Sequence, residues 1–206
     1  MRKISESTVR RLSVYLRLLE EFERRGRETV NSDEMAVRGH TTSAQVRKDL
    51  SFFGSFGKRG MGYEVVELAA RLRDILGLGQ TYRVAVIGAG KIGRALVQYR
   101  GFAERGFEVV SIYDVDAAKV GGTWSGVEVR HACELESDLK DAPIDIAVLA
   151  IPADVAQRTL DLLVRLGVKA ILNFAPIQLA HPEDVTVQDV NMALELETLS
   201  YALRNA

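Results

Sequence analysis

The residues Gly88-Ala89-Gly90-Lys91-Ile92-Gly93 have the spacing G-x-G-x-x-G. They follow an apolar run at 84–87 and open an amphipathic segment, which is the strand–turn–helix context that a dinucleotide-binding loop requires. The first glycine permits a tight turn, the second lets the backbone approach a pyrophosphate, and the third lets the helix pack on the sheet. Because the start of a helix offers unpaired N–H groups to phosphates, these six residues predict a nucleotide-binding site.

A carboxylate suited to a ribose follows at Asp114. It ends the next apolar run and lies 21 residues beyond Gly93, and an acid about 20 residues beyond such a loop binds a ribose 2′-OH. Its charge repels a 2′-phosphate, and Val115 supplies no cation to offset that repulsion. NAD(H) is therefore favoured over NADP(H), with coenzyme A or another nucleotide as the alternative.

Two further strand ends carry candidate cofactor contacts. The carboxyl ends of parallel strands line the cofactor crevice of a doubly wound sheet. The candidate neighbours of the nicotinamide or ribose at these ends are Ala150, Pro152, Asn173, Phe174 and Pro176. The alternative interpretation is that proline merely marks the change from strand to loop.

The stretch TSAQVRKDLSFFGSFGKRGMGY, residues 42–63, joins a basic helical pattern to a run of glycines, aromatics and cations. Helices expected before it complete the layout of a winged helix, in which the third helix enters the major groove of DNA. Thr42 and Gln45 match a capping box. The candidate DNA contacts on the helix are Ser43, Gln45, Arg47 and Lys48, and its expected packing residues are Ala44, Val46, Leu50 and Phe53. Lys58 and Arg59 form a slim basic tip suited to a minor groove. The alternative is a solvated helix and a flexible loop.

The elements that position these residues follow from hydrophobic periodicity. Apolar residues at three- and four-residue steps predict helices over 5–25, 32–38, 42–53 and 64–76. In the first of these, the residues that share the apolar face are Val9, Leu12, Leu16, Leu19 and Phe22. Glycines at 77–80 then mark a boundary, after which apolar, β-branched runs alternate with helical segments, as in a parallel α/β sheet. An amphipathic helix over 192–203 ends the pattern. We therefore expect an α/β protein with a winged-helix domain at 1–78, a Rossmann-like domain at 79–190 and a C-terminal helix at 191–206.

Composition narrows the class of protein. Residues 1–80 carry 15 Lys and Arg against 11 Asp and Glu, whereas residues 81–206 carry 12 against 17, so a polyanion partner fits the first part only. No run approaches the roughly 20 apolar residues of a membrane span, and the start of the chain lacks an apolar leader. The single cysteine, Cys133, excludes an internal disulfide. We expect a cytoplasmic protein without a membrane partner.

The sequence offers little for catalysis. A dehydrogenase needs a positioned acid or base and a substrate pocket, yet His131 and His181 follow short strand-like segments without a recognisable catalytic partner. Three histidines and one cysteine also lack a metal-ligand spacing. We expect no catalytic residue and no metal, and interpret the chain as a ligand-controlled DNA-binding regulator. The alternatives are a small NAD-dependent oxidoreductase and a coenzyme A-binding module, each with an N-terminal interaction domain.

The chain resembles the Rex family of redox-sensing transcriptional repressors. The resemblance lies in residues 42–63 and in the segments VIGAGKIGRALVQYRGF, YDVDAAKVG, ILNFAP and LELETLSYAL, and covers about residues 5–204 in consistent order. It implies a homodimer whose C-terminal helix is exchanged between subunits. It also implies operator binding to respiratory and fermentative genes when NADH/NAD⁺ is low, with release by NADH.

The resemblance further implies a network that reports the state of the cofactor. Its members here are Arg17, Tyr99 near the cofactor, and the segment before the last helix. The family has an Asp in a DVDLA-like stretch, where this chain has DVNMA with Asn191. An Arg–carboxylate pair thus becomes a weaker hydrogen bond to a neutral acceptor. We expect the coupling between cofactor and DNA binding to be softened or rerouted.

Overall fold

The computed structural model describes residues 4–54, 56–57 and 62–205, and the chain divides into two compact units, Met1–Gln80 and Thr81–Ala206. Each unit has its own hydrophobic core. In the described part of the chain, none of the helices has the length and apolar character needed to cross a membrane. Lys58 and Arg59 of the predicted basic tip lie outside the described residues.

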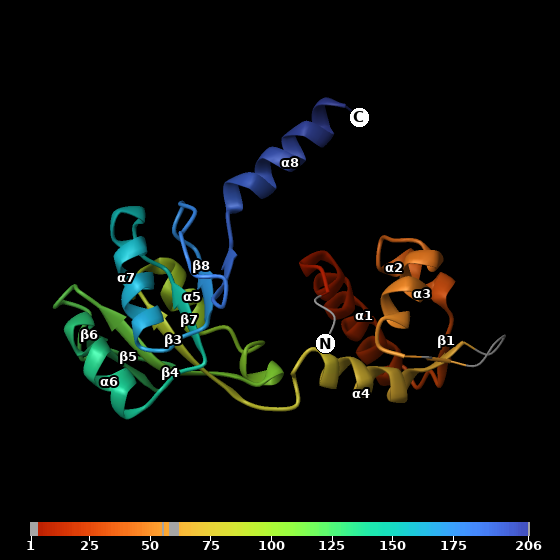
Figure 1. Cartoon of the computed structure of the whole chain (residues 1–206), viewed down its shortest axis with the longest axis horizontal. Coiled ribbons are helices and arrows are strands. Elements are labelled where there is room, and N and C mark those ends of the chain that lie inside the picture. The colour runs from red at the N-terminus through yellow and green to blue at the C-terminus, as the bar shows by residue number, and fades with distance from the viewer. Residues whose placement is uncertain (1–3, 55, 58–61, 206) are drawn as a thin grey trace. The chain divides into compact units, whose positions relative to one another are not determined.

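The first unit consists mainly of helices (Figure 1). Its elements are α1 (Glu6–Arg24), β1 (Thr29–Val30), α2 (Ser32–Arg38), α3 (Ser43–Ser51), β2 (Tyr63–Glu64) and α4 (Val65–Ile75). Polar caps begin the first three helices at Ser5, Asn31 and Thr42, because each side chain accepts a hydrogen bond from a first-turn N–H. The predicted helices are therefore confirmed within one or two residues at most ends.

The core of the first unit lies between α1 and α4 and under α3. Leu12, Leu16 and Leu19 of α1 are fully buried, as their spacing predicted, and Tyr15 joins them. Two expected packing positions are wrong. Val9 is 37 % exposed, and Ala44 lies on the exposed side of α3. Both stand at an edge of the apolar stripe, where a small rotation of the helix moves a side chain into solvent.

The two short strands of this unit come from either side of α2, α3 and the glycine-rich stretch. β1 and β2 are antiparallel, with Val30 opposite Tyr63. Gly62 has φ +81°, and a Cβ there would press on the carbonyl of Val30, so only glycine allows the chain to enter β2 at this point. Gly62 therefore fixes how the chain enters β2 after the glycine-rich stretch.

The second unit is built on a sheet that contains seven strands within the described residues. They are β3 (Tyr82–Ile87), β4 (Phe107–Asp114), β5 (Thr123–Trp124), β6 (Val127–His131), β7 (Ile146–Leu149), β8 (Ala170–Asn173) and β9 (Thr186–Asp189). Their order is β5-β6-β4-β3-β7-β8-β9, and each neighbouring pair is parallel except β5 and β6. Without β5 this is the Rossmann order 3-2-1-4-5-6. The crevice of such a sheet opens where β3 gives way to β7.

Helices cover both faces of the sheet, which explains the unbroken apolar runs (Figure 1). The helices α6 (Leu135–Asp141) and α7 (Ala153–Arg165) pack against Ala85 and Ile87, and α5 (Lys91–Val97) packs against Val84 and Val86. The β5–β6 hairpin is the main addition to the prediction. Its strands are short, and Ser125 and Gly126 both have positive φ, as a two-residue hairpin turn requires.

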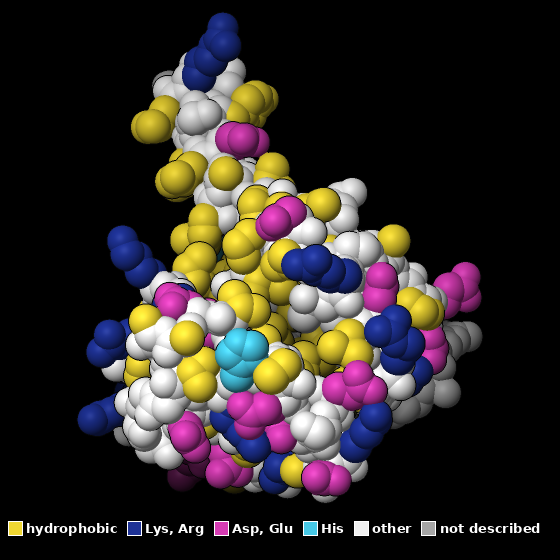
Figure 2. All heavy atoms as spheres, turned by 90° about the vertical axis from the view of Figure 1, so that its left-hand side faces the viewer, with side chains coloured by type: hydrophobic (Ala, Val, Ile, Leu, Met, Phe, Trp, Pro, Cys, Tyr) yellow, Lys and Arg dark blue, Asp and Glu magenta, His cyan; other side chains and the backbone are white. Residues whose placement is uncertain are grey.

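The last helix, α8 (Met192–Arg204), buries none of its residues. Figure 2 shows hydrophobic side chains along its length. The large apolar side chains exposed on it are those of Met192, Leu194, Leu196, Leu199, Tyr201 and Leu203. A helix of this composition gains stability by packing its apolar residues against another surface.

Candidate functional site

The glycine loop between β3 and α5 has the geometry of a phosphate cradle. Gly88 has φ +104°, and a Cβ on it would overlap the carbonyl oxygen of Ala150. A Cβ on Gly93 would overlap the carbonyl oxygen of Gly88, so α5 can lie on the turn only because this side chain is absent. A Cβ on Gly90 would instead meet no atom within 4 Å. The loop therefore leaves room for a ligand at Gly90, as a pyrophosphate requires.

The loop is also tied to the neighbouring strand end. Gly88 N–H donates to Tyr113 O at 2.7 Å, and Ala89 N–H donates to Asp114 Oδ2 at 2.7 Å. No side chain caps the start of α5, so its first-turn amides have no cap of the kind that Thr42 gives α3. These amides suit an anionic ligand.

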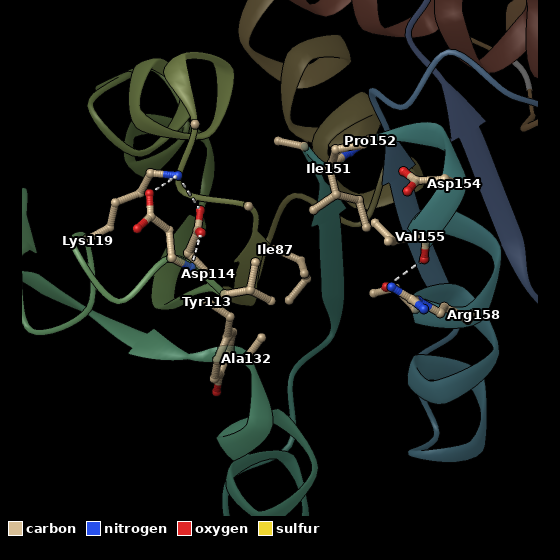
Figure 3. Close-up of a pocket in the computed structure, with 16 residues that line it drawn as sticks. Ile87, Tyr113, Asp114, Lys119, Ala132, Ile151, Pro152, Asp154, Val155 and Arg158 are labelled. Atoms are coloured by element: carbon tan, nitrogen blue, oxygen red, sulfur yellow. Dashed lines mark hydrogen bonds and ion pairs between the residues drawn. The ribbon is translucent and has the colours of Figure 1, made fainter.

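A cavity of about 690 Å³ lies beside this loop (Figure 3). Its walls come from the loop, from the ends of β4 and β7, and from α7. Of the cofactor contacts predicted from the sequence, those that line it are Gly88, Gly90, Asp114, Ala150 and Pro152. The volume lies within the range of about 300–1,000 Å³ common for small-molecule sites. The sheet thus brings together residues up to 64 positions apart, from Gly88 to Pro152.

Asp114 is almost buried, with 8 % of its surface exposed. Its Oδ2 accepts from Ala89 N–H and, at 3.1 Å, from Lys119 Nζ, and its Oδ1 accepts from Asp116 N–H at 2.8 Å. Burial disfavours the charged carboxylate, but these hydrogen bonds outweigh it and hold the pKa of Asp114 below its ordinary value. The same contact with Asp114 raises the pKa of Lys119. Both groups are therefore charged at neutral pH.

Other predicted cofactor contacts do not line this cavity. Asn173 is fully buried, and its amide donates to Ile177 O at 2.9 Å and Asp189 Oδ1 at 2.8 Å while accepting from Ala175 N–H. Its side chain is thus used to hold the loop after β8. Phe174 packs against the core, and Tyr99, 60 % exposed, stacks edge-on against Phe102.

Pro176 and Asn191 line a smaller cavity of about 230 Å³ at the start of α8. Asn191 caps this helix, because its Oδ1 accepts from Ala193 N–H at 3.0 Å and Leu194 N–H at 3.4 Å. The nearby Asp189 is bonded to Asn173.

In the first unit, α3 presents a basic face. Arg47, Lys48 and Ala44 are exposed on it, Ser43 is half-buried, and Arg47 Nη1 donates to Ser32 Oγ at the start of α2, at 2.8 Å. Arg17 is exposed on α1. Guanidinium and ammonium groups on a helix face suit a phosphate backbone and base edges.

Behind that face, a buried carboxylate anchors α3 to α1. Asp49 has no exposed surface and accepts a bidentate pair from Arg11, at 2.6 and 2.8 Å, together with Tyr15 OH at 3.1 Å and Gln45 Nε2 at 2.7 Å. Burial opposes its charge, but these donors lower the pKa of Asp49 below its ordinary value. Burial, followed by the bond to Asp49, raises the pKa of Tyr15 to about 12.

Comparison with known proteins shows to which family the chain belongs. Residues 79–177 match the family model "CoA binding domain", and residues 3–51 match "Putative DNA-binding protein N-terminus". The redox-sensing transcriptional repressor Rex of Carboxydothermus hydrogenoformans is 46% identical over 98% of this chain and 97% of its own length. The Rex protein of Syntrophomonas wolfei is 45% identical over 98% and 96%. The chain belongs to the Rex family of redox-sensing transcriptional repressors.

Solved structures of a Rex-family repressor, RSP, share the fold. The complex of RSP with NADH matches at a TM-score of 0.91 and 38% identity, over 100% of this chain and 96% of that one. The complex with NAD⁺ and operator DNA matches at 0.94 and 40%, over 100% and 94%. Both units of the chain thus have counterparts in a DNA-binding, nucleotide-binding Rex structure.

One prediction about an individual side chain is wrong for this Rex chain, and a second is incomplete. Gln45 does not reach back to complete a capping box at Thr42, although Thr42 Oγ1 accepts from Gln45 N–H; the Gln45 side chain instead donates from Nε2 to Asp49. A hydrogen bond to a buried carboxylate is charge-assisted, whereas the bond from Thr42 N–H to Gln45 Oε1 in a capping box is between neutral groups, so the bond to Asp49 is the stronger. Asp114 also has a cation beside it, since Lys119 rather than Val115 supplies one.

The other residues that line the cavity were not predicted from the sequence. They are Tyr113, Asp116, Lys119, Ala132, Asp154, Arg158 and Thr159, together with their apolar neighbours. Of these residues, only Lys119 could have been inferred from the sequence. It lies five positions after Asp114, and the turn that follows β4 brings it back to the end of that strand. Ala132 and the residues of α7 reach the cavity because of the order of the strands in the sheet. The spacing of residues along the sequence does not indicate that order.

Proposed function

We propose that this chain binds operator DNA when NADH/NAD⁺ is low and releases it when NADH binds, so that it represses respiratory and fermentative genes. The observation that carries the proposal is one chain with an open G-x-G-x-x-G cradle in one unit and a basic, exposed α3 in the other. The RSP complexes with NADH and with NAD⁺ and operator DNA support it. Repression of this kind takes place in the cytoplasm, where the operator is.

The support for NAD(H) over coenzyme A comes from the same relatives. RSP, which is 38–40% identical to this chain, was solved with NADH and with NAD⁺. The model "CoA binding domain" matches residues 79–177 only. The cavity adds Asp114, whose carboxylate suits a ribose hydroxyl. We propose Gly88 to Gly93, Asp114, Ala150 and Pro152 as the cofactor contacts.

A gel shift on an operator-containing fragment tests the function. NADH and NAD⁺ are titrated separately against a constant amount of protein and DNA at two salt concentrations. We expect salt-dependent binding that NADH abolishes and NAD⁺ affects much less. DNA binding that is indifferent to both nucleotides would contradict the proposal.

Lys48 is expected to contact DNA. Lys48→Ala should weaken operator binding about tenfold and reduce the dependence of log K on log salt by about one, as loss of one phosphate contact does. The matched control is Lys140→Ala, which removes the same charge from α6. Equal operator affinities of the two variants, measured by fluorescence anisotropy, would exclude Lys48 from the DNA interface.

We propose that α8 is exchanged within a homodimer, since its exposed apolar side chains need a partner surface. Leu199→Glu places a charge among them, and should shift the chain from dimer to monomer in light scattering coupled to gel filtration. The matched control is Glu197→Ala, a truncation of a polar side chain on the same helix. A dimer unaffected by Leu199→Glu would place the interface elsewhere.

We propose Arg17, Tyr99 and Asn191 as the residues that couple cofactor binding to DNA release. Asn191→Asp restores the charge expected in the family, so we expect it to lower the NADH concentration that releases DNA by about fivefold. This factor corresponds to about 1 kcal/mol, the difference between a charge-assisted and a neutral hydrogen bond. Asn191→Ser is the control, because serine caps a helix about as well without a charge. Equal release midpoints for wild type and Asn191→Asp would mean that Asn191 does not limit the coupling.

A further inference from the structure

Lys119 forms a small charged cluster with two carboxylates at the end of β4. Its Nζ lies 3.1 Å from Asp114 Oδ2 and 3.5 Å from Asp116 Oδ2. All three residues line the main cavity, and Figure 3 shows Asp114 and Lys119 opposite Asp154 and Arg158 of α7. Two carboxylates thus share one ammonium group at the place where a ribose is expected.

The cluster leaves room for a hydroxyl group. A carboxylate offers about four acceptor positions. Asp114 uses two on Oδ2, for Ala89 N–H and Lys119, and one on Oδ1, for Asp116 N–H. One position on Oδ1 is therefore left for a ligand, and a ribose 2′-OH can donate to it without disturbing the ion pair.

A 2′-phosphate, unlike a hydroxyl group, brings negative charge next to the two carboxylates. It carries about −1.5 to −2 charges at neutral pH, and the cation within reach is already neutralised by two carboxylates. A phosphate that accepts from the third N–H of Lys119 lies beside both carboxylates, and their repulsion offsets the attraction of the ammonium group.

We propose that Lys119 is a latent cation for a 2′-phosphate, and that its neutralisation by Asp114 and Asp116 excludes NADP(H). The inference rests on the proposed binding of NAD(H) in this cavity and names a specificity-determining residue for it. The chain rejects the phosphorylated cofactor although a suitable cation is present. Removing carboxylate charge alone then creates a site for the 2′-phosphate.

Calorimetric titration of the full-length protein with NADH and with NADPH tests this. We expect wild type to bind NADH and not NADPH, and Asp114→Asn to raise the affinity for NADPH by about tenfold or more, the scale of a charge-assisted hydrogen bond. Adding Lys119→Met to Asp114→Asn should abolish that gain. Lys119→Met alone should not raise NADPH affinity.

Two further variants make the test specific. Asp116→Asn changes a side chain that is 48 % exposed and keeps an acceptor for Ala118 N–H, so the fold is retained, and a gain in NADPH affinity that depends on Lys119 is expected here too. Lys91→Met in the Asp114→Asn background is the matched control, and should lower NADH and NADPH affinity alike because Lys91 opens α5.

The outcomes separate the two proposals. The inference is wrong if neither Asp114→Asn nor Asp116→Asn gains affinity for NADPH, or if the gain persists without Lys119. A folded wild-type protein that binds no NADH would instead overturn the proposed function.

Discussion

Gly90→Ala is expected to weaken NADH binding about 100-fold, equivalent to about 2.7 kcal/mol, while the second unit stays folded. A Cβ at Gly90 meets no protein atom within 4 Å, so the substitution leaves the loop itself intact. That same Cβ projects into the space where a pyrophosphate must approach the backbone. The added methyl group therefore separates the phosphates from the amides of α5.

The control comes from the other two glycines of the loop. A Cβ at Gly93 or Gly88 overlaps a backbone carbonyl oxygen, of Gly88 and Ala150 respectively. Gly93→Ala should therefore lose both NADH binding and thermal stability, whereas Gly90→Ala loses binding alone. NADH titration and thermal unfolding of each variant measure the difference. A Gly90→Ala protein that binds NADH normally would show that the pyrophosphate lies elsewhere.

Asp49→Ala is expected to destabilise the first unit by about 3–5 kcal/mol, the cost of breaking a buried ion pair. Asp49 has no exposed surface, and its removal leaves Arg11, Tyr15 and Gln45 without their shared acceptor. Tyr15 is also fully buried, so water does not readily replace the lost bond. Because Asp49 joins α3 to α1, operator binding should fall with stability.

Chemical denaturation of wild type and variant measures this effect. Asp33→Ala is the matched control, since Asp33 is exposed in the first turn of α2, where its loss costs about 0.3–1 kcal/mol. A similar loss for both variants would mean that the Asp49 cluster contributes no more than a surface charge.

The Asp49 cluster also predicts a pH dependence. Its folded-state pKa is lower than the ordinary value of 3.8, so the charged carboxylate stabilises the fold above that value. This contribution is lost as the pH falls through the lower folded-state pKa. The stability difference between wild type and Asp49→Ala should therefore be largest near neutral pH and shrink below about pH 4. A difference that is constant down to pH 2 would contradict an ionised Asp49.

Much of the fold follows from local signals in the sequence. Apolar spacing placed Leu12, Leu16 and Leu19 on the buried face of α1, and Asn31 and Thr42 marked helix starts because caps act within three residues. The glycine spacing likewise identified the loop between β3 and α5, since the three glycines recur at a fixed spacing within one strand–turn–helix segment. Such signals lie within one element or one turn.

Side-chain partners across elements could not be predicted in this way. Gln45 was predicted to complete a capping box at Thr42, but its side chain donates to Asp49, as does that of Arg11, 38 positions away from Asp49. Asn173 ended a strand as a cofactor contact would, yet Asp189 and the following loop use its amide. In both cases a buried polar group requires partners that only the folded chain brings within reach.

The sequence by itself therefore determined the class of molecule: a basic helical head, a G-x-G-x-x-G Rossmann unit, an amphipathic last helix, and their order along the chain. These depend on periodicity, capping and glycine sterics, which act between near neighbours. Tertiary structure alone decided which charged groups pair with one another and which are buried. It gave Asp114 a cation in Lys119, and it buried Asp49 on the side of α3 that faces α1. Electrostatic partners are selected by distance in space and by burial.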